Sequence, residues 1–280
     1  MSQTDIWADG DHELGEGARC VDGRLVFVDI LAGRLSEVPE DGRRTPRELL
    51  RLDVPLGAVA PVHGRHGHWI AAAGTGIALL MPDGWPEEHS SVPTRMNDGV
   101  CDPHGRFRAG SMPYDGTPGV GSLYRTDPDS SVRRALDGMT IVNGPAFPAD
   151  GALLYVADSA AGVVHRCTLD ADGNATGREE FARIAAGGSP DGMVVDDTGR
   201  LWVAVWGHGA IHRYRPDGAL DATIPLPTPQ PTSACLLREG GRLLITTARH
   251  GLTGATGVAG AVLAVTVDAT APAAHAFGAP

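Results

Sequence analysis

Short apolar runs, each ended by Gly, Asp or Asn, recur from one end of the chain to the other. Residues 25–28 (LVFV) and 201–205 (LWVAV) are typical, because each run follows a turn that contains glycine. No stretch of useful length has the apolar spacing of an amphipathic helix. The pattern predicts an all-β fold built from many short strands.

The runs repeat at a regular interval. In six segments a turn glycine precedes a strand, and these glycines are Gly23, Gly67, Gly105, Gly151, Gly199 and Gly241. They lie 44, 38, 46, 48 and 42 residues apart, and a period of about 40–50 residues is typical of β-propeller blades. We therefore predict a six-bladed β-propeller with four antiparallel strands per blade, formed as a single domain by residues 1–280. The Ala- and Pro-rich residues 271–280 form either a tail or part of the ring closure.

Four polar residues occupy nearly the same place in this repeat. Glu16 lies seven residues before its marker glycine, and Asn97, Asn143 and Asp191 lie eight residues before theirs. Equivalent positions in successive blades are equivalent in space, so these side chains are expected at one mouth of the central channel. The alternative is that Asn and Asp precede glycine merely as turn residues.

These residue types suit a metal ion. The carboxylates of Glu16 and Asp191 and the amide oxygen of Asn143 are hard ligands for Ca²⁺, Mg²⁺ or Mn²⁺, and less obviously for Zn²⁺ or Fe²⁺. Without a cation, two buried carboxylates would repel each other. Arg95 and Asn97 lie on one face of an extended segment and could both hold hydroxyl groups of a polar substrate.

The net charge of the chain limits the classes of molecule that it is expected to bind. The chain has 280 residues and a formal net charge of −11, which disfavours nucleic acid or an anionic membrane as the main partner. No apolar run approaches ~20 residues, and the acidic beginning of the chain has no signal-peptide pattern, so a cytoplasmic protein is expected. The four cysteines form no CxxC pair and are expected to be reduced thiols.

Histidines are a further candidate. The cluster HGRHGH at residues 63–68 falls in a turn at the opposite face of the propeller, where a solvated loop is the simpler interpretation. His208 and His250 are expected at the same face as the candidate metal site, but each stands alone. No GxSxG, HExxH or phosphate-loop motif occurs, so serine-nucleophile chemistry has no support.

Several stretches resemble the SMP-30/gluconolactonase/regucalcin-like propellers. They are LGEGARCVDGRLVFVDI from Leu14, RMNDGVCDPHGRFRAGSM from Arg95, VNGPAFPADGALLYVADS from Val142, SPDGMVVDDTGRLWVAVWGHGAIHRY from Ser189 and PTSACLL from Pro231. The resemblance implies one divalent metal ion held by Glu16, Asn143 and Asp191, with Asp191 also the general base. It implies substrate contacts from Arg95 and Asn97 and hydrolysis of a sugar lactone to its aldonic acid.

The chain departs from the family pattern in two places. Ala18 follows the Glu-Gly pair where proline is common. Many members hold sugar hydroxyls with a glutamate on one loop. In this chain the corresponding loop is shorter, and the nearest acidic residue is Asp115.

The leading hypothesis is a metal-dependent lactonase, expected to be a monomer. The alternatives are a non-catalytic propeller that binds calcium or a small molecule, and a metal-dependent esterase of non-sugar esters.

Overall fold

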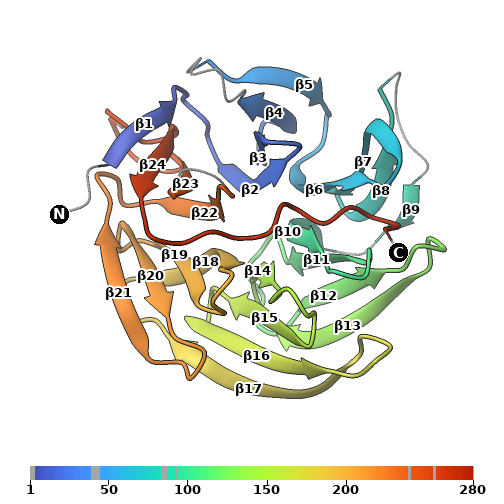
Figure 1. Ribbon diagram of the computed structural model, residues 1–280. Coiled ribbons are helices and arrows are strands. Elements are labelled where there is room, and N and C mark those ends of the chain that lie inside the picture. Colours follow the sequence, from blue (N-terminus) through green and yellow to red (C-terminus); the bar gives the residue numbers. More distant parts are fainter. Residues whose placement is uncertain are drawn as a thin grey trace.

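Six four-stranded antiparallel sheets surround a common axis in the computed structural model (Figure 1). The structure describes residues 4–38, 45–82, 88–91, 94–238, 241–254 and 257–279. All regular elements among these residues are strands, and no apolar helix of membrane-spanning length occurs among them. The predicted six-bladed β-propeller is confirmed.

Each blade runs from an inner strand at the axis to an outer strand at the rim. Blade 1 contains β2 (Gly15–Val21), β3 (Arg24–Asp29), β4 (Arg34–Val38) and β5 (Arg47–Arg51). Blade 2 contains β6 (Leu56–Val62), β7 (Arg65–Ala73), β8 (Gly76–Leu80) and β9 (Glu88–Ser91). Blade 3 contains β10 (Arg95–Cys101), β11 (Phe107–Met112), β12 (Gly121–Thr126) and β13 (Val132–Met139).

The remaining three blades follow the same order. Blade 4 contains β14 (Val142–Ala146), β15 (Leu153–Asp158), β16 (Val163–Leu169) and β17 (Ala175–Arg183). Blade 5 contains β18 (Ser189–Val195), β19 (Leu201–Trp206), β20 (Ala210–Tyr214) and β21 (Leu220–Pro225). Blade 6 contains β22 (Pro231–Leu236), β23 (Arg242–Thr247), β24 (Val262–Thr266) and β1 (Thr4–Ala8).

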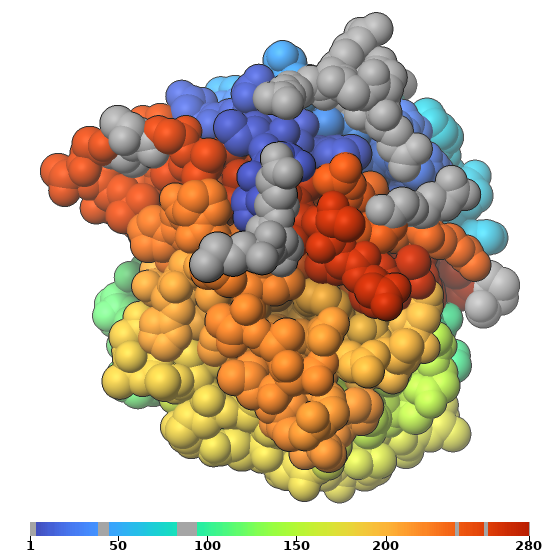
Figure 2. All heavy atoms as spheres, turned by 60° about the vertical axis from the view of Figure 1, so that its left-hand side comes forward, coloured from blue at the N-terminus to red at the C-terminus, as the bar shows by residue number. Residues whose placement is uncertain are grey.

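The N-terminal strand closes the ring. β1 pairs antiparallel with β24 as the outermost strand of blade 6, and Figure 2 shows the blue N-terminal residues beside the red and orange C-terminal ones. The N-terminal strand therefore closes the ring, and the Ala- and Pro-rich residues at the C-terminal end do not contribute a strand to this closure.

The hydrophobic core consists of six layers, one between each pair of neighbouring blades. Adjacent residues of one strand enter different layers because side chains alternate across a strand. In β19, Trp202 packs toward blade 6 and Val203 toward blade 4. The apolar runs are continuous rather than alternating because both faces of these strands are buried.

The marker glycines lie where the repeat predicted them, with one exception. Gly23, Gly105, Gly151 and Gly199 all have positive φ in the connection after the inner strand, and Gly241 lies at the equivalent place before β23. Gly67 instead lies within β7, at the register shift between the pairs Pro61–Trp69 and Val62–Arg65. In blade 2 the turn therefore comes three residues earlier, at Gly64.

The C-terminal segment forms a strap across the face opposite the candidate site (Figure 1). Its amides at Ala274 and Phe277 donate to the carbonyls of Cys20 and Pro61, at the far ends of two inner strands. Residues 271–275 also line a cavity of about 80 Å³ inside the channel. The strap therefore covers that end of the channel and leaves the opposite mouth as the route to the axis.

We expect Phe277→Ala to lower the free energy of unfolding by about 3 kcal/mol, since the ring is buried against blades 2 and 3. Equilibrium urea denaturation would measure the change. Tyr114→Ala is the matched control, because Tyr114 is 68% exposed and its loss should cost less than about 0.5 kcal/mol. Equal midpoints for the wild type and the Phe277 variant would show that the strap contributes no stability.

Candidate metal and active site in the central channel

A β-bulge interrupts the inner strand of each blade that supplies a predicted site residue. In β2, Glu16 pairs with Val28 and Arg19 pairs with Val26, so two residues of β2 lie opposite one residue of β3. The same irregularity occurs in β10, β14 and β18. A bulge redirects side chains and stops ladder pairing locally, which frees this level of the inner strands to form a site.

The bulges show that the polar residues do not share one register position. Glu16 and Asn143 are the last paired residues before their bulges, whereas Asn97 and Asp191 lie inside theirs. Gly144 occupies the bulge position next to Asn143 with φ of 51°. A Cβ on Gly144 would lie 2.4 Å from the carbonyl oxygen of Asp191, so glycine is required for the two blades to approach this closely.

The amide of Asn143 is the centre of the site. Its Nδ2 donates to Asp191 Oδ1 and to Ser159 Oγ, the latter at 3.2 Å. Its Oδ1 accepts a hydrogen bond of 3.0 Å from Asn97 Nδ2. Glu16 and Asp191 share a side-chain hydrogen bond. Glu16, Asn143 and Asp191 therefore lie together, although 175 residues separate the first from the last along the chain.

The carboxylates of this cluster are held in an unfavourable environment. Burial raises the pKa of Glu16 to about 8, and the negative charge of Asp98 adds to the effect. Burial also raises the pKa of Asp191 well above its ordinary value, with further contributions from Glu16 and Asp98. A divalent cation between the carboxylates would remove this repulsion and would favour their charged forms.

The residues present fit a cation of that kind. Two carboxylates and one amide oxygen are hard ligands that leave coordination positions for water or substrate. Within the described residues, no group of three or more His, Cys, Asp and Glu side chains is placed to hold a metal ion. The candidate set is of a different composition, since its third oxygen would come from the amide of Asn143. In the structure this amide turns Nδ2 toward Asp191 and Oδ1 toward Asn97, so a ligand role would require the amide to present its oxygen to the carboxylates instead.

The predicted substrate-binding residues lie in two places. Arg95 is buried, and its guanidinium donates to Met96 O at 3.0 Å and to Met112 Sδ at 2.8 Å. Asn97 donates both to Asn143 Oδ1 and to Val142 O, so its amide forms part of the wall of the site. Asp115 is exposed in the loop after β11, where its Oδ1 accepts hydrogen bonds from the amide and hydroxyl of Thr117.

Two aspartates position the strands that carry Glu16 and Asn143, and the sequence reasoning missed this role. Asp29 accepts hydrogen bonds from the amides of Glu13 and Leu14, just before β2. Asp158 accepts the equivalent bonds from Thr140 and Ile141, just before β14. In the sequence, both blades 1 and 4 have an aspartate at the end of the second strand, in Asp29-Ile30 and Asp158-Ser159, and this shared position could have indicated the role.

The histidines lie apart from the cluster. His208 Nε2 is 3.3 Å from Ala186 O, and His250 Nδ1 is 2.9 Å from Glu13 Oε1, with both side chains exposed. Residues 63–68 border an open cavity of about 630 Å³ between blades 1 and 2, together with residues of the strap. Of the cysteines, Cys101, Cys167 and Cys235 are buried thiols, and Cys20 is half-buried.

The chain is similar to proteins that are named as sugar lactonases and regucalcins. Residues 14–249 match the family described as SMP-30/Gluconolactonase/LRE-like region. The L-arabinolactonase of Azospirillum brasilense is 34% identical over 267 residues, covering 89% of this chain and 86% of that protein. The 6-deoxy-6-sulfogluconolactonase of Pseudomonas putida is 36% identical over 237 residues, covering 81% and 79%.

A solved structure shows the same architecture. The calcium-binding protein regucalcin from Agrobacterium tumefaciens has a TM-score of 0.89 at 26% identity, covering 99% of this chain and 97% of that one. The fold and the axial cluster define a six-bladed propeller with an oxygen-rich site in its channel. The chain belongs to the SMP-30/gluconolactonase/LRE-like family, whose members include lactonases of sugars.

We expect Asp29→Asn to lower the free energy of unfolding by about 1–3 kcal/mol at pH 7, because two half-buried amides lose a charged acceptor. Burial opposes ionisation of Asp29, but its bonds with His12, Leu14 and Glu13 outweigh burial and lower its pKa. The wild-type advantage should therefore be complete above the unfolded value of about 3.9 and vanish as pH falls through the folded pKa.

Chemical denaturation between pH 3 and 8 would test this, with Asp53→Asn as an exposed control. An advantage of the wild type that grows toward acid pH would contradict the assignment.

Proposed function

We propose that the protein is a divalent-metal-dependent lactonase that hydrolyses a sugar lactone to the aldonic acid. The observation that carries the proposal is the meeting of Glu16, Asp191 and Asn143 on the axis, with two buried carboxylates whose pKa values are raised in the absence of a cation. Relatives named as lactonases of sugars support the reaction class.

The cation would be held by Glu16, Asn143 and Asp191, and when bound it would polarise the lactone carbonyl and favour the tetrahedral oxyanion. Ser159 and Asn97 fix the Asn143 amide from two sides. Asp191 acts as the general base and accepts a proton from the attacking water at its carboxylate. Its burial keeps the accepting oxygen out of bulk solvent.

The substrate enters from the mouth that the C-terminal strap leaves open. Arg95 lies at this end of the channel and is close enough to Glu16 for their charges to interact. Its guanidinium makes no carboxylate ion pair among the described residues, so it is available for hydroxyl or ring oxygens of the lactone. Asn97 and the loop residue Asp115 are proposed as further substrate contacts. We also expect a cytoplasmic monomer.

Asp191→Asn and Glu16→Gln should each lower kcat/KM for a sugar lactone at least ~100-fold, through loss of the cation and, for Asp191, of the base. Acid release at pH near 7 would be followed for gluconolactone, xylonolactone and arabinonolactone, with spontaneous hydrolysis subtracted. Chelator treatment should abolish turnover, and adding back one of Ca²⁺, Zn²⁺, Mn²⁺, Mg²⁺ or Fe²⁺ should restore it.

Glu13→Gln is the matched control, because Glu13 is exposed near β2 and contacts His250. Wild-type rates in the Asp191 or Glu16 variant would contradict the assigned roles. Cation binding without turnover of any lactone would instead favour a non-catalytic calcium-binding propeller, and turnover restricted to non-sugar esters would favour an esterase.

Asp115→Asn should raise KM for the lactone several-fold and change kcat little, because a loop contact to a hydroxyl is made equally in the ground and transition states. Steady-state kinetics would measure both constants. The exposed Asp129→Asn on a remote turn serves as the control. An unchanged KM would remove Asp115 from the substrate site and leave Arg95 and Asn97 as the proposed contacts.

A further inference from the structure

A buried arginine lies directly beneath the candidate metal site. Arg19 follows Glu16 by three residues on β2 and is 8% exposed. Its Nη1 donates to Ala18 O at 2.7 Å, and its Nη2 donates to Gly99 O at 2.9 Å. Its side chain also lines the cavity at the strap end of the channel. The guanidinium is therefore fixed between the metal-site level and that cavity.

The partner of Arg19 is a third carboxylate of the channel. Arg19 Nη2 lies 3.2 Å from Asp98 Oδ1, and Asp98 is completely buried. The other oxygen of Asp98 accepts a hydrogen bond of 3.1 Å from the amide of Gly144, the residue after Asn143. Asp98 thus joins Arg19 of blade 1 to the bulge of blade 4, and it interacts electrostatically with both Glu16 and Asp191.

Blade 2 is built to permit this contact. Arg19 and Asp98 belong to blades 1 and 3, which are not neighbours in the ring. Between them lies β6, where a Cβ on Gly57 would lie 2.4 Å from Asn97 O. Glycine at this position therefore lets β6 approach β10 closely, and the side chain of Arg19 spans the distance from β2 to Asp98 on β10.

We propose that Arg19 is a built-in counter-ion of the channel, which neutralises Asp98 and so leaves Glu16 and Asp191 as the two negative charges that one divalent cation balances. The inference rests on the metal site of the proposed function, but it concerns the charge of the channel and not the reaction. Arg19 is a positioning residue, since its guanidinium pairs with Asp98 and not with a proposed metal ligand, although its charge also acts on Glu16.

The charge count gives the expected sign of each variant. Three carboxylates and no internal cation would attract a divalent ion more strongly than the wild-type channel does, and the effect is large because the effective dielectric constant in a protein is about 20. Loss of Asp98 alone would leave the positive charge of Arg19 unpaired beneath the cation. A role limited to packing would instead weaken binding in every variant.

The test is a double-mutant cycle read by calorimetric titration of the chelator-stripped protein with Ca²⁺. Arg19→Met, which keeps an unbranched apolar stem and removes the charged guanidinium, should lower the Kd for Ca²⁺ at least about tenfold. Asp98→Asn should raise the Kd at least about tenfold. The double variant should return to within about threefold of the wild type, because both charges are gone.

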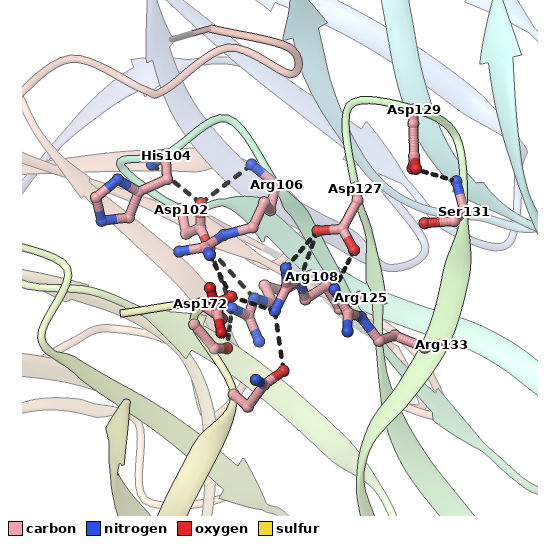
Figure 3. A network of polar contacts seen from close by, with 12 residues as sticks. Asp102, His104, Arg106, Arg108, Arg125, Asp127, Asp129, Ser131, Arg133 and Asp172 are labelled. Carbon is pink, nitrogen blue, oxygen red and sulfur yellow. Dashed lines mark hydrogen bonds and ion pairs between the residues drawn. The ribbon is translucent and has the colours of Figure 1, made fainter. Parts of the chain in front are cut away.

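Two further variants separate charge from structure. Arg19→Lys keeps the charge and should bind Ca²⁺ as the wild type does. Arg108→Met breaks another buried ion pair, with Asp102 at 3.1 Å in the arginine–aspartate network of blade 3 (Figure 3). That variant should lower thermal stability and leave the Kd for Ca²⁺ unchanged. Circular dichroism would confirm that each protein is folded.

An Arg19→Met protein that is folded and binds Ca²⁺ with unchanged or weaker affinity would overturn the inference. If Arg19→Met does not fold, the Asp98→Asn and Arg19→Lys proteins still decide, because equal Kd values for both would overturn it too. Lactone hydrolysis by the wild type is measured separately. Tighter Ca²⁺ binding by Arg19→Met without lactone turnover would support the counter-ion and reject the lactonase, and the converse result would do the opposite.

Discussion

The central constraint on this structure is that a closed ring must hold two like-charged carboxylates together on its axis. Glu16 and Asp191 come from blades 1 and 5 and share a hydrogen bond in a buried channel. Isolated charges in such a place are costly, so the arrangement persists only because the rest of the ring holds it. Six apolar layers between the blades and the pairing of β1 with β24 provide that constraint.

Several polar residues around the cluster fix the direction of its side chains and strands. Ser159 and Asn97 orient Asn143, and Asp29 and Asp158 clamp the segments that lead into β2 and β14. These groups are supplied by loops and bulges at one face of the propeller, while the strap covers the other. The same scaffold therefore combines stability with access, since the strap packs across one end of the channel and the candidate site lies toward the other.

Much of this could be predicted from local pattern. The six-fold repeat follows from turn glycines and apolar runs, because each blade repeats the same set of short strands and turns. The meeting of Glu16, Asn143 and Asp191 follows from the repeat phase to within one residue. The repeat phase could not predict the bulges, because a bulge depends on pairing with the next strand. These bulges place Glu16 and Asn143 at a different register position from Asn97 and Asp191.

The sequence by itself determined the blade number, the all-β class and the oxygen ligands available to a cation, because period and residue type are local properties. Tertiary structure alone decided which end of the chain closes the ring, and that residues 271–277 cover the far face. It alone paired Arg19 with Asp98 across blade 2, since 79 residues separate them and only the curvature of the ring brings them within 3.2 Å. Long-range electrostatic pairs have no sequence period, so only the folded ring reveals them.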